Sequence, residues 1–184
     1  MTLEDVLLRL VPILEHVQVP YMLTGSVASS AHGMPRSTRD LDIVIAPTHA
    51  QLLALMQEFP SSEYYADEQQ ALQALTRRSQ FNIIDHATGW KVDFIIAEDS
   101  EYGRTAVARR EVIDMAGNAV YVASAEDVLI AKLQWAKISG SERQLQDAAG
   151  IVSIQADSLD VAYVESWVQK LSLDKQWDVV RERG

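Results

Sequence analysis

Two aspartates one position apart constrain the fold more than any other feature of this chain. Asp40 and Asp42 lie in the run DLDIVIA, in which all other positions are apolar. In an extended strand successive side chains alternate between faces, so both carboxylates point to one side while Leu41 and Ile43 point to the other. We therefore predict a strand over residues 41–46. Two carboxylates on one face can share a hard cation such as Mg²⁺, which prefers oxygen ligands.

A tight turn at Gly25 and Ser26 precedes this strand. Residues 19–24 are predicted to form a short strand, and the small-residue stretch 26–32 is predicted to form a helix. A strand, a Gly-Ser turn and a helix in this order place backbone N–H groups and the positive end of the helix where a phosphate can bind. The sequence thus predicts a phosphate-binding turn that accompanies a candidate magnesium site.

Apolar periodicity and turn residues predict the other elements. We expect helices over residues 3–17, 47–59, 67–79 and 124–138, hairpins of strands 81–86 with 90–97 and 111–115 with 119–123, and further helices over about 143–153, 158–171 and 174–183. The pattern predicts an α/β (α+β) fold, a mixed β-sheet flanked by helices. We expect an α/β core at residues 1–123 and a C-terminal helical region at residues 124–184 that packs on it.

Composition limits the classes of function. The chain has no cysteine, which excludes disulfides, thiolate zinc sites and a cysteine nucleophile and fits a reducing cytosol. Its net charge of −10 argues against a broad, nonspecific grip on nucleic acid, because such binding depends on basic residues. We recognise neither a signal peptide nor an apolar span of membrane length, so a cytoplasmic protein without membrane contact is expected.

A third carboxylate, Asp93, lies inside the apolar run KVDFIIA. Burying a carboxylate is costly unless a positive or hydrogen-bonding group meets it. An ion pair with Lys91 or with an arginine, or a position at the edge of the sheet, would explain Asp93 without any function. Because Asp40 and Asp42 also need an explanation, we favour Asp93 as a third carboxylate that faces the metal.

The combination of these features resembles the nucleotidyltransferase superfamily typified by DNA polymerase beta. The residues that carry the resemblance are Gly25, Ser26, Ala28, Gly33, Arg36, Thr38, Asp40, Asp42 and Asp93. The pattern looks closest to the AbiEii-like toxin branch of minimal nucleotidyltransferases, whose later helices carry segments similar to Lys132-Leu133 and to Arg143 with Asp147. The resemblance covers about residues 20–153 and implies a nucleotidyltransferase-type sheet.

The resemblance implies an enzyme that transfers a nucleoside monophosphate from a nucleoside triphosphate to a hydroxyl group. Asp40, Asp42 and Asp93 would be the catalytic residues and would hold two Mg²⁺ ions, with Asp93 on the side of the attacking hydroxyl. The residues expected to bind the nucleotide are Gly25, Ser26, Arg36, Arg39 and Lys132. The implied acceptor is an RNA end, such as that of tRNA, or a protein hydroxyl, and a cognate antitoxin is a further expected partner.

Other interpretations stay open at this point. The chain could be a catalytically inactive nucleotide-binding or regulatory module of the same fold, or a structural α/β protein whose aspartates only cap and hydrogen-bond. Arg36 and Arg39 could be solvated surface residues, and Lys132 could extend its ammonium group to solvent from a helix. Asp147 could orient Lys132, but the sequence favours a solvated helix acid. The three carboxylates and the Gly-Ser turn together favour catalysis.

Overall fold

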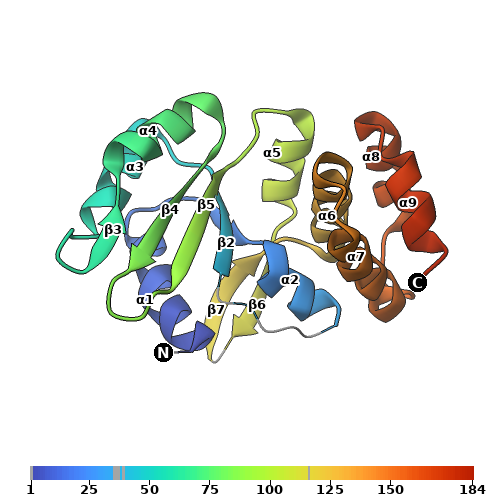
Figure 1. Cartoon of the computed structure of the whole chain (residues 1–184), viewed down its shortest axis with the longest axis horizontal. Coiled ribbons are helices and arrows are strands. Elements are labelled where there is room, and N and C mark those ends of the chain that lie inside the picture. The colour runs from blue at the N-terminus through green and yellow to red at the C-terminus, as the bar shows by residue number, and fades with distance from the viewer. Residues whose placement is uncertain (1, 35–37, 39, 116) are drawn as a thin grey trace. The chain divides into compact units, whose positions relative to one another are not determined.

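The structure is a computed structural model that describes residues 2–34, 38, 40–115 and 117–184. The chain divides into two compact units. Figure 1 shows its helices and strands, coloured from the N-terminus to the C-terminus. The first unit comprises Met1–Leu23 and Thr38–Val122, and the second comprises Thr24–Ser37 and Ala123–Gly184. The segment 24–37 therefore belongs to the unit of the C-terminal helices, whereas the domain division after residue 123 stays a prediction.

A mixed β-sheet forms the centre of the first unit. In the part of the chain that the structure describes, it has seven strands in the order β3-β4-β5-β2-β1-β7-β6. The strands are β1 (Tyr21–Leu23), β2 (Asp40–Ile45), β3 (Tyr64–Ala66), β4 (Gln80–Asp85), β5 (Lys91–Ile96), β6 (Glu111–Met115) and β7 (Asn118–Val122). β2 pairs with β5 and β1 with β7 in parallel, while the other neighbours are antiparallel. The predicted mixed sheet flanked by helices is confirmed, and so are both predicted hairpins, β4–β5 and β6–β7.

Local capping explains where the helices of this unit begin. They are α1 (Leu3–His16), α3 (His49–Gln57), α4 (Glu68–Arg77) and α5 (Glu101–Ala108). Thr2 and Thr48 form capping boxes at α1 and α3, because each hydroxyl accepts from a backbone N–H that the helix cannot satisfy itself. Asp67 and Ser100 cap α4 and α5 with a single bond each. The helix α1 also continues across Pro12.

Side-chain alternation gives the central strands one buried face and one partly open face. The buried face carries Leu41, Ile43 and Ile45 of β2 and Val92, Phe94 and Ile96 of β5. The rings of Phe81 and Phe94 stack across β4 and β5 with their centroids 5.2 Å apart. Each fully buried side chain of this size contributes about 1.5–3 kcal/mol relative to exposure. The apolar face therefore fixes the register of the strands, and the aspartates must lie on the opposite face.

The described residues of the second unit form helices and no strand. The helices are α2 (Gly25–His32), α6 (Ala125–Ser139), α7 (Glu142–Gln155), α8 (Val161–Leu171) and α9 (Asp174–Arg181). The end of α2 is held by two hydrogen bonds: His32 Nε2 lies 2.8 Å from the carbonyl oxygen of Ala123, and Gln155 Nε2 donates to the His32 carbonyl at 2.9 Å. Among the described residues there is no helix with both the length and the apolar composition needed to cross a bilayer.

A buried polar network joins α8 to the start of α6. Asp127 donates its N–H to Ser124 Oγ, which caps α6, and the Ser124 hydroxyl donates to Asp127 Oδ2. Tyr163 Oη donates to Asp127 Oδ1 at 2.8 Å from α8. A buried carboxylate is stable when its oxygens accept such bonds. The network therefore ties the C-terminal helices to α6 through specific polar contacts in addition to apolar packing.

Candidate functional site

Asp42 and Asp93 lie side by side on two parallel strands. The register of β2 and β5 pairs Asp42 with Asp93 and Asp40 with Lys91. Neighbouring strands are about 4.8 Å apart, and residues in register project from the same face of the sheet. The structure therefore brings the three predicted carboxylates to one face, although they come from two separate stretches of the chain. Their roles as metal ligands and catalytic residues stay predictions.

Lys91 provides a positive charge at this group of carboxylates. Its Nζ lies 2.8 Å from Asp93 Oδ2, and the side chains of Lys91 and Asp93 are 36% and 13% exposed. The hydrogen bond to Asp93 raises the pKa of Lys91 above its ordinary value, and the nearby charges of Asp93, Asp40 and Asp42 act in the same direction. The ion pair that the sequence offered as an explanation of Asp93 without function is thus present.

The donor set nevertheless fits a hard divalent cation. Asp40, Asp42 and Asp93 offer only carboxylate oxygens, which are the ligands that Mg²⁺ prefers. No group of three acidic or histidine side chains within the described residues is already arranged to hold a metal ion. A divalent cation at Asp93 would repel the Lys91 ammonium group, so metal binding requires this lysine to swing aside on its flexible stem.

Asn82 joins the same face from β4, and sequence reasoning missed it. The antiparallel register of β4 and β5 places Asn82 opposite Asp93, and the residue is half-buried. Its amide offers one acceptor and two donor hydrogens. The predicted turn at residues 87–89 would have placed Asn82 opposite Phe94, because the length of a hairpin loop sets which residues face each other, and the observed register differs from it by one residue.

Gly25, at the predicted turn, is the first residue of α2, which belongs to the second unit. Gly25 has a φ of +62°, a left-handed conformation that glycine adopts without the steric cost of a Cβ atom. Ser26 follows in the first turn of the helix and is half-buried. The predicted change from a turn to a helix is therefore confirmed, while phosphate binding by Gly25 and Ser26 stays a prediction.

Lys132 is buried and paired in the second unit. Its Nζ donates to Asp147 Oδ2 at 2.6 Å, and the two side chains are 5% and 17% exposed. The predicted solvated state of Asp147 is therefore wrong, and Lys132 does not extend to solvent from α6. The sequence could not show this because the partners are 15 residues apart and meet only when α6 and α7 pack together. A phosphate bound by Lys132 would compete with Asp147.

Two predicted phosphate-binding residues, Arg36 and Arg39, lie outside the described residues. Their predicted contacts with a nucleotide therefore stay predictions from the sequence.

Comparisons with known proteins found matches to the fold of this chain but none to a family model or a curated protein. Solved structures do match: the lincomycin-bound lincosamide antibiotic adenylyltransferase LnuA has a TM-score of 0.57 and 15% identity over 84% of this chain and 98% of that chain. ANT(2")-Ia in complex with adenylyl-2"-tobramycin has a TM-score of 0.56 and 12% identity over 96% and 99%. A nucleotidyltransferase-like antigenic protein from Paracoccidioides brasiliensis has a TM-score of 0.55 and 17% identity over 97% and 91%.

The chain has a nucleotidyltransferase-type fold. The predicted fold class is confirmed by this likeness, which extends over most of the chain. Because fold does not imply function, the activity has to be argued from the residues of the site. The narrower resemblance to the AbiEii-like branch stays a prediction.

Proposed function

We propose that this protein is a nucleotidyltransferase that moves a nucleoside monophosphate from a nucleoside triphosphate to a hydroxyl acceptor. The observation that supports the proposal most is the placement of Asp42 in register with Asp93 on parallel strands, with Asp40 on the same face. These strands belong to a nucleotidyltransferase-type fold. Three carboxylates on one open face suit a site for Mg²⁺ and a triphosphate, since Mg²⁺ is commonly held by a few carboxylates together with substrate phosphates.

The proposed reaction forms a bond between the acceptor oxygen and the α-phosphorus and breaks the bond from that phosphorus to pyrophosphate. Asp40 and Asp42 would hold two Mg²⁺ ions, and Asp93 would complete the site on the acceptor side and take the proton of the hydroxyl. Bound magnesium would supply positive charge for the attacking and departing oxygens. Asp93 can take this role once Lys91 has moved away from its Oδ2 atom.

Residues of the second unit are proposed to contact the phosphates. Backbone N–H groups that follow Gly25, together with the hydroxyl of Ser26, would hold the terminal phosphates at the start of α2. Lys132 would add a positive charge, and Asp147 fixes the position of its ammonium group in the absence of nucleotide. Arg36 and Arg39 complete the proposed set.

The proposed acceptor is a hydroxyl on an RNA end, such as that of tRNA, or on a protein, as the AbiEii-like resemblance implies. A cognate antitoxin would then be a partner. Small hydroxylated molecules should be tested as acceptors too, because one structural neighbour is a lincosamide antibiotic adenylyltransferase and another is in complex with adenylyl-2"-tobramycin. The net charge of −10 favours acceptors that do not require an extended basic surface.

The test is to incubate the protein with Mg²⁺ and each α-labelled nucleoside triphosphate in separate reactions with total RNA, a cell protein extract and a panel of hydroxylated antibiotics. We expect pyrophosphate release together with transfer of label to one of these acceptors. Asp42→Asn should abolish both signals, whereas Asp99→Asn, which alters an exposed ion pair with Arg104, should not. Transfer that persists in Asp42→Asn would contradict the assigned site.

A second candidate, a nucleotide-binding module without turnover, is favoured by the Lys91–Asp93 ion pair. A lysine that neutralises the carboxylates could replace the metal permanently and allow the fold to bind nucleotide without transferring it. Calorimetric titration with ATP distinguishes the two functions. The enzyme should bind ATP more tightly with Mg²⁺ than with EDTA, while the inactive module should bind equally in both and release no pyrophosphate.

A further inference from the structure

A small hollow lies under α1 in the first unit, away from Asp40, Asp42 and Asp93. Val92 of β5 and Ile83 of β4 form its floor, and Val6 and Leu10 of α1 cover it. Side chains alternate along a strand, so Asp93, the neighbour of Val92, projects from the opposite face of the sheet. The hollow is therefore separate from the candidate active site. Its cavity volume is about 40 Å³.

One carboxylate stands in these apolar surroundings with a loosely held counterion. The side chain of Asp85 is 14% exposed, and its Oδ1 accepts a hydrogen bond from the N–H of Thr88 at 2.9 Å. Its Oδ2 lies 3.8 Å from Arg9 Nη1, which is beyond hydrogen-bonding distance, and the Arg9 side chain is 61% exposed. A carboxylate in apolar surroundings gains more from a cation in direct contact than from one held at this distance.

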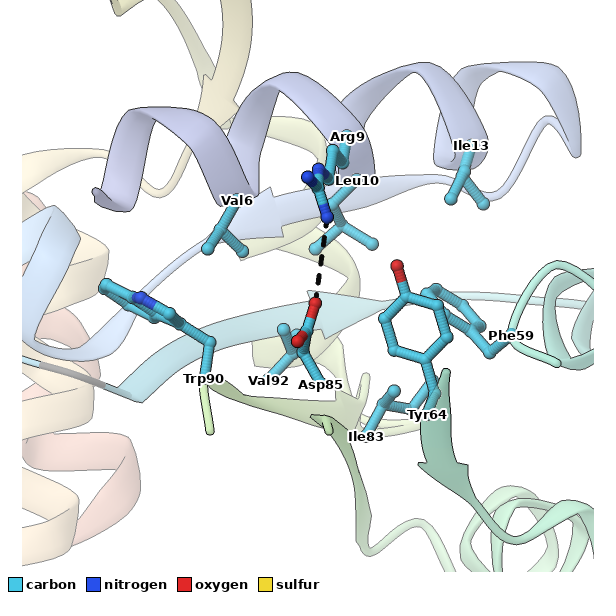
Figure 2. Close-up of a pocket in the computed structure, with 10 residues that line it drawn as sticks. All are labelled: Val6, Arg9, Leu10, Ile13, Phe59, Tyr64, Ile83, Asp85, Trp90 and Val92. Carbon is cyan, nitrogen blue, oxygen red and sulfur yellow. Dashed lines mark ion pairs between the residues drawn. The ribbon is translucent and has the colours of Figure 1, made fainter. Parts of the chain in front are cut away.

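Aromatic side chains complete the surroundings of Asp85. Figure 2 shows Arg9 reaching from α1 toward Asp85, with Trp90 on one side of the carboxylate and Tyr64 on the other. Tyr64 is also the residue paired with Asp85 across β3 and β4. Aromatic faces attract cations, and Trp does so most strongly. The charge of Asp85 therefore selects a cation that the neighbouring aromatic side chains can support, while the floor and cover select an apolar body.

We propose that this hollow binds a small alkylammonium ion. The ammonium group contacts Asp85 Oδ2 in place of the Arg9 guanidinium group, and the alkyl group packs between Leu10 and Val92. A cavity of this volume has room for only a few water molecules. The enclosed part of the ligand is accordingly small, a short alkyl group.

The probes are isobutylamine, isobutanol and isobutyrate, which share a branched alkyl group and differ in charge. Binding is followed at neutral pH by the ¹H–¹⁵N NMR signal of the Trp90 indole, which Trp90→Phe assigns among the four tryptophans. We expect a saturable shift with isobutylamine, a weaker one with isobutanol and none with isobutyrate. No shift with isobutylamine, or equal binding of isobutyrate, overturns the proposal.

Two substitutions with opposite expected effects make the test sharper. Asp85→Asn keeps an oxygen for the Thr88 N–H and removes the charge, so the affinity for isobutylamine should fall about tenfold, to the level of isobutanol. Arg9→Gln removes the competing cation from an exposed position, so the affinity for isobutylamine should rise, by up to about fivefold. An unchanged affinity in Asp85→Asn, or a lower affinity in Arg9→Gln, contradicts the proposal. The remaining amide signals show whether each variant is folded.

Discussion

Two lysine–aspartate pairs have the same chemistry but different surroundings. Lys91 and Asp93 lie two positions apart on one strand and are 36% and 13% exposed, whereas Lys132 and Asp147 come from two helices and are 5% and 17% exposed. The difference lies in the lysines, and the first pair is called the exposed pair after its lysine. Lys91 can leave its partner and be hydrated. Removing Lys132 leaves Asp147 as a largely buried, uncompensated charge. At the exposed pair a metal cation can therefore replace the lysine ammonium group. The buried pair holds α6 against α7.

The largest expected effect is on catalysis at the exposed pair. If the proposed function holds, Asp93→Asn should reduce nucleotidyl transfer about 10³-fold, because the proposed site would lose the charge assigned to the attacking hydroxyl. Its free energy of unfolding should change by less than about 1 kcal/mol, since Lys91 can be hydrated. Pyrophosphate release and urea unfolding measure the two quantities. Transfer within tenfold of the parent protein would mean that Asp93 serves only the ion pair.

A smaller effect, on stability, is expected at the buried pair. Lys132→Met should lower the free energy of unfolding by about 3 kcal/mol, because it leaves Asp147 without its cation. Combining it with Asp147→Leu should restore most of the loss, since both charges are then absent. Urea unfolding without nucleotide measures both variants. A single change that costs less than about 1 kcal/mol would remove the contrast between the pairs.

A still smaller change in stability is expected when Lys91 is replaced. Lys91→Met should lower the free energy of unfolding by about 2 kcal/mol, because it leaves Asp93, which is 13% exposed, without its cation. It should also strengthen the binding of Mn²⁺ used as a probe for Mg²⁺. Electron paramagnetic resonance measures the unbound Mn²⁺. Lys175→Met, a change at an exposed lysine of the second unit, is the control for net charge. Weaker Mn²⁺ binding in Lys91→Met would show that the lysine supports the metal site and does not compete with it.

The smallest effect concerns alkaline pH. The hydrogen bond to Asp93 raises the pKa of Lys91 above 10.5, so the folded state holds this proton more tightly than the unfolded state. The resulting stability is complete below pH 10.5 and is lost as the pH rises through the folded value. Burial also raises the pKa of Tyr21 to about 12, which removes stability over an overlapping range. Unfolding of Lys91→Met should therefore be compared with its parent in a Tyr21→Phe background, and identical pH profiles would contradict the prediction.

Local patterns predicted most of the elements, and the missed ones have physical explanations. The hairpin β4–β5 combines two apolar strands with a short turn, so its signal is strong. The strand β3 has only three residues, too few for a period of two to stand out. The helix α5 has eight residues of mixed polarity, and its first turn depends on the hydrogen bond from the Gly103 N–H to Ser100 Oγ. The strand β3 is completed by its pairing with β4, and α5 begins where Ser100 caps it.

The sequence by itself determined which side chains share a face of a strand. Asp40 and Asp42 point together because alternation is a property of the extended backbone, whatever surrounds it. Only the tertiary structure decided that β5 lies in parallel beside β2, and that Lys132 is buried against Asp147. These contacts depend on which surfaces pack against each other and how far water is excluded, and neither is a property of a local stretch of residues.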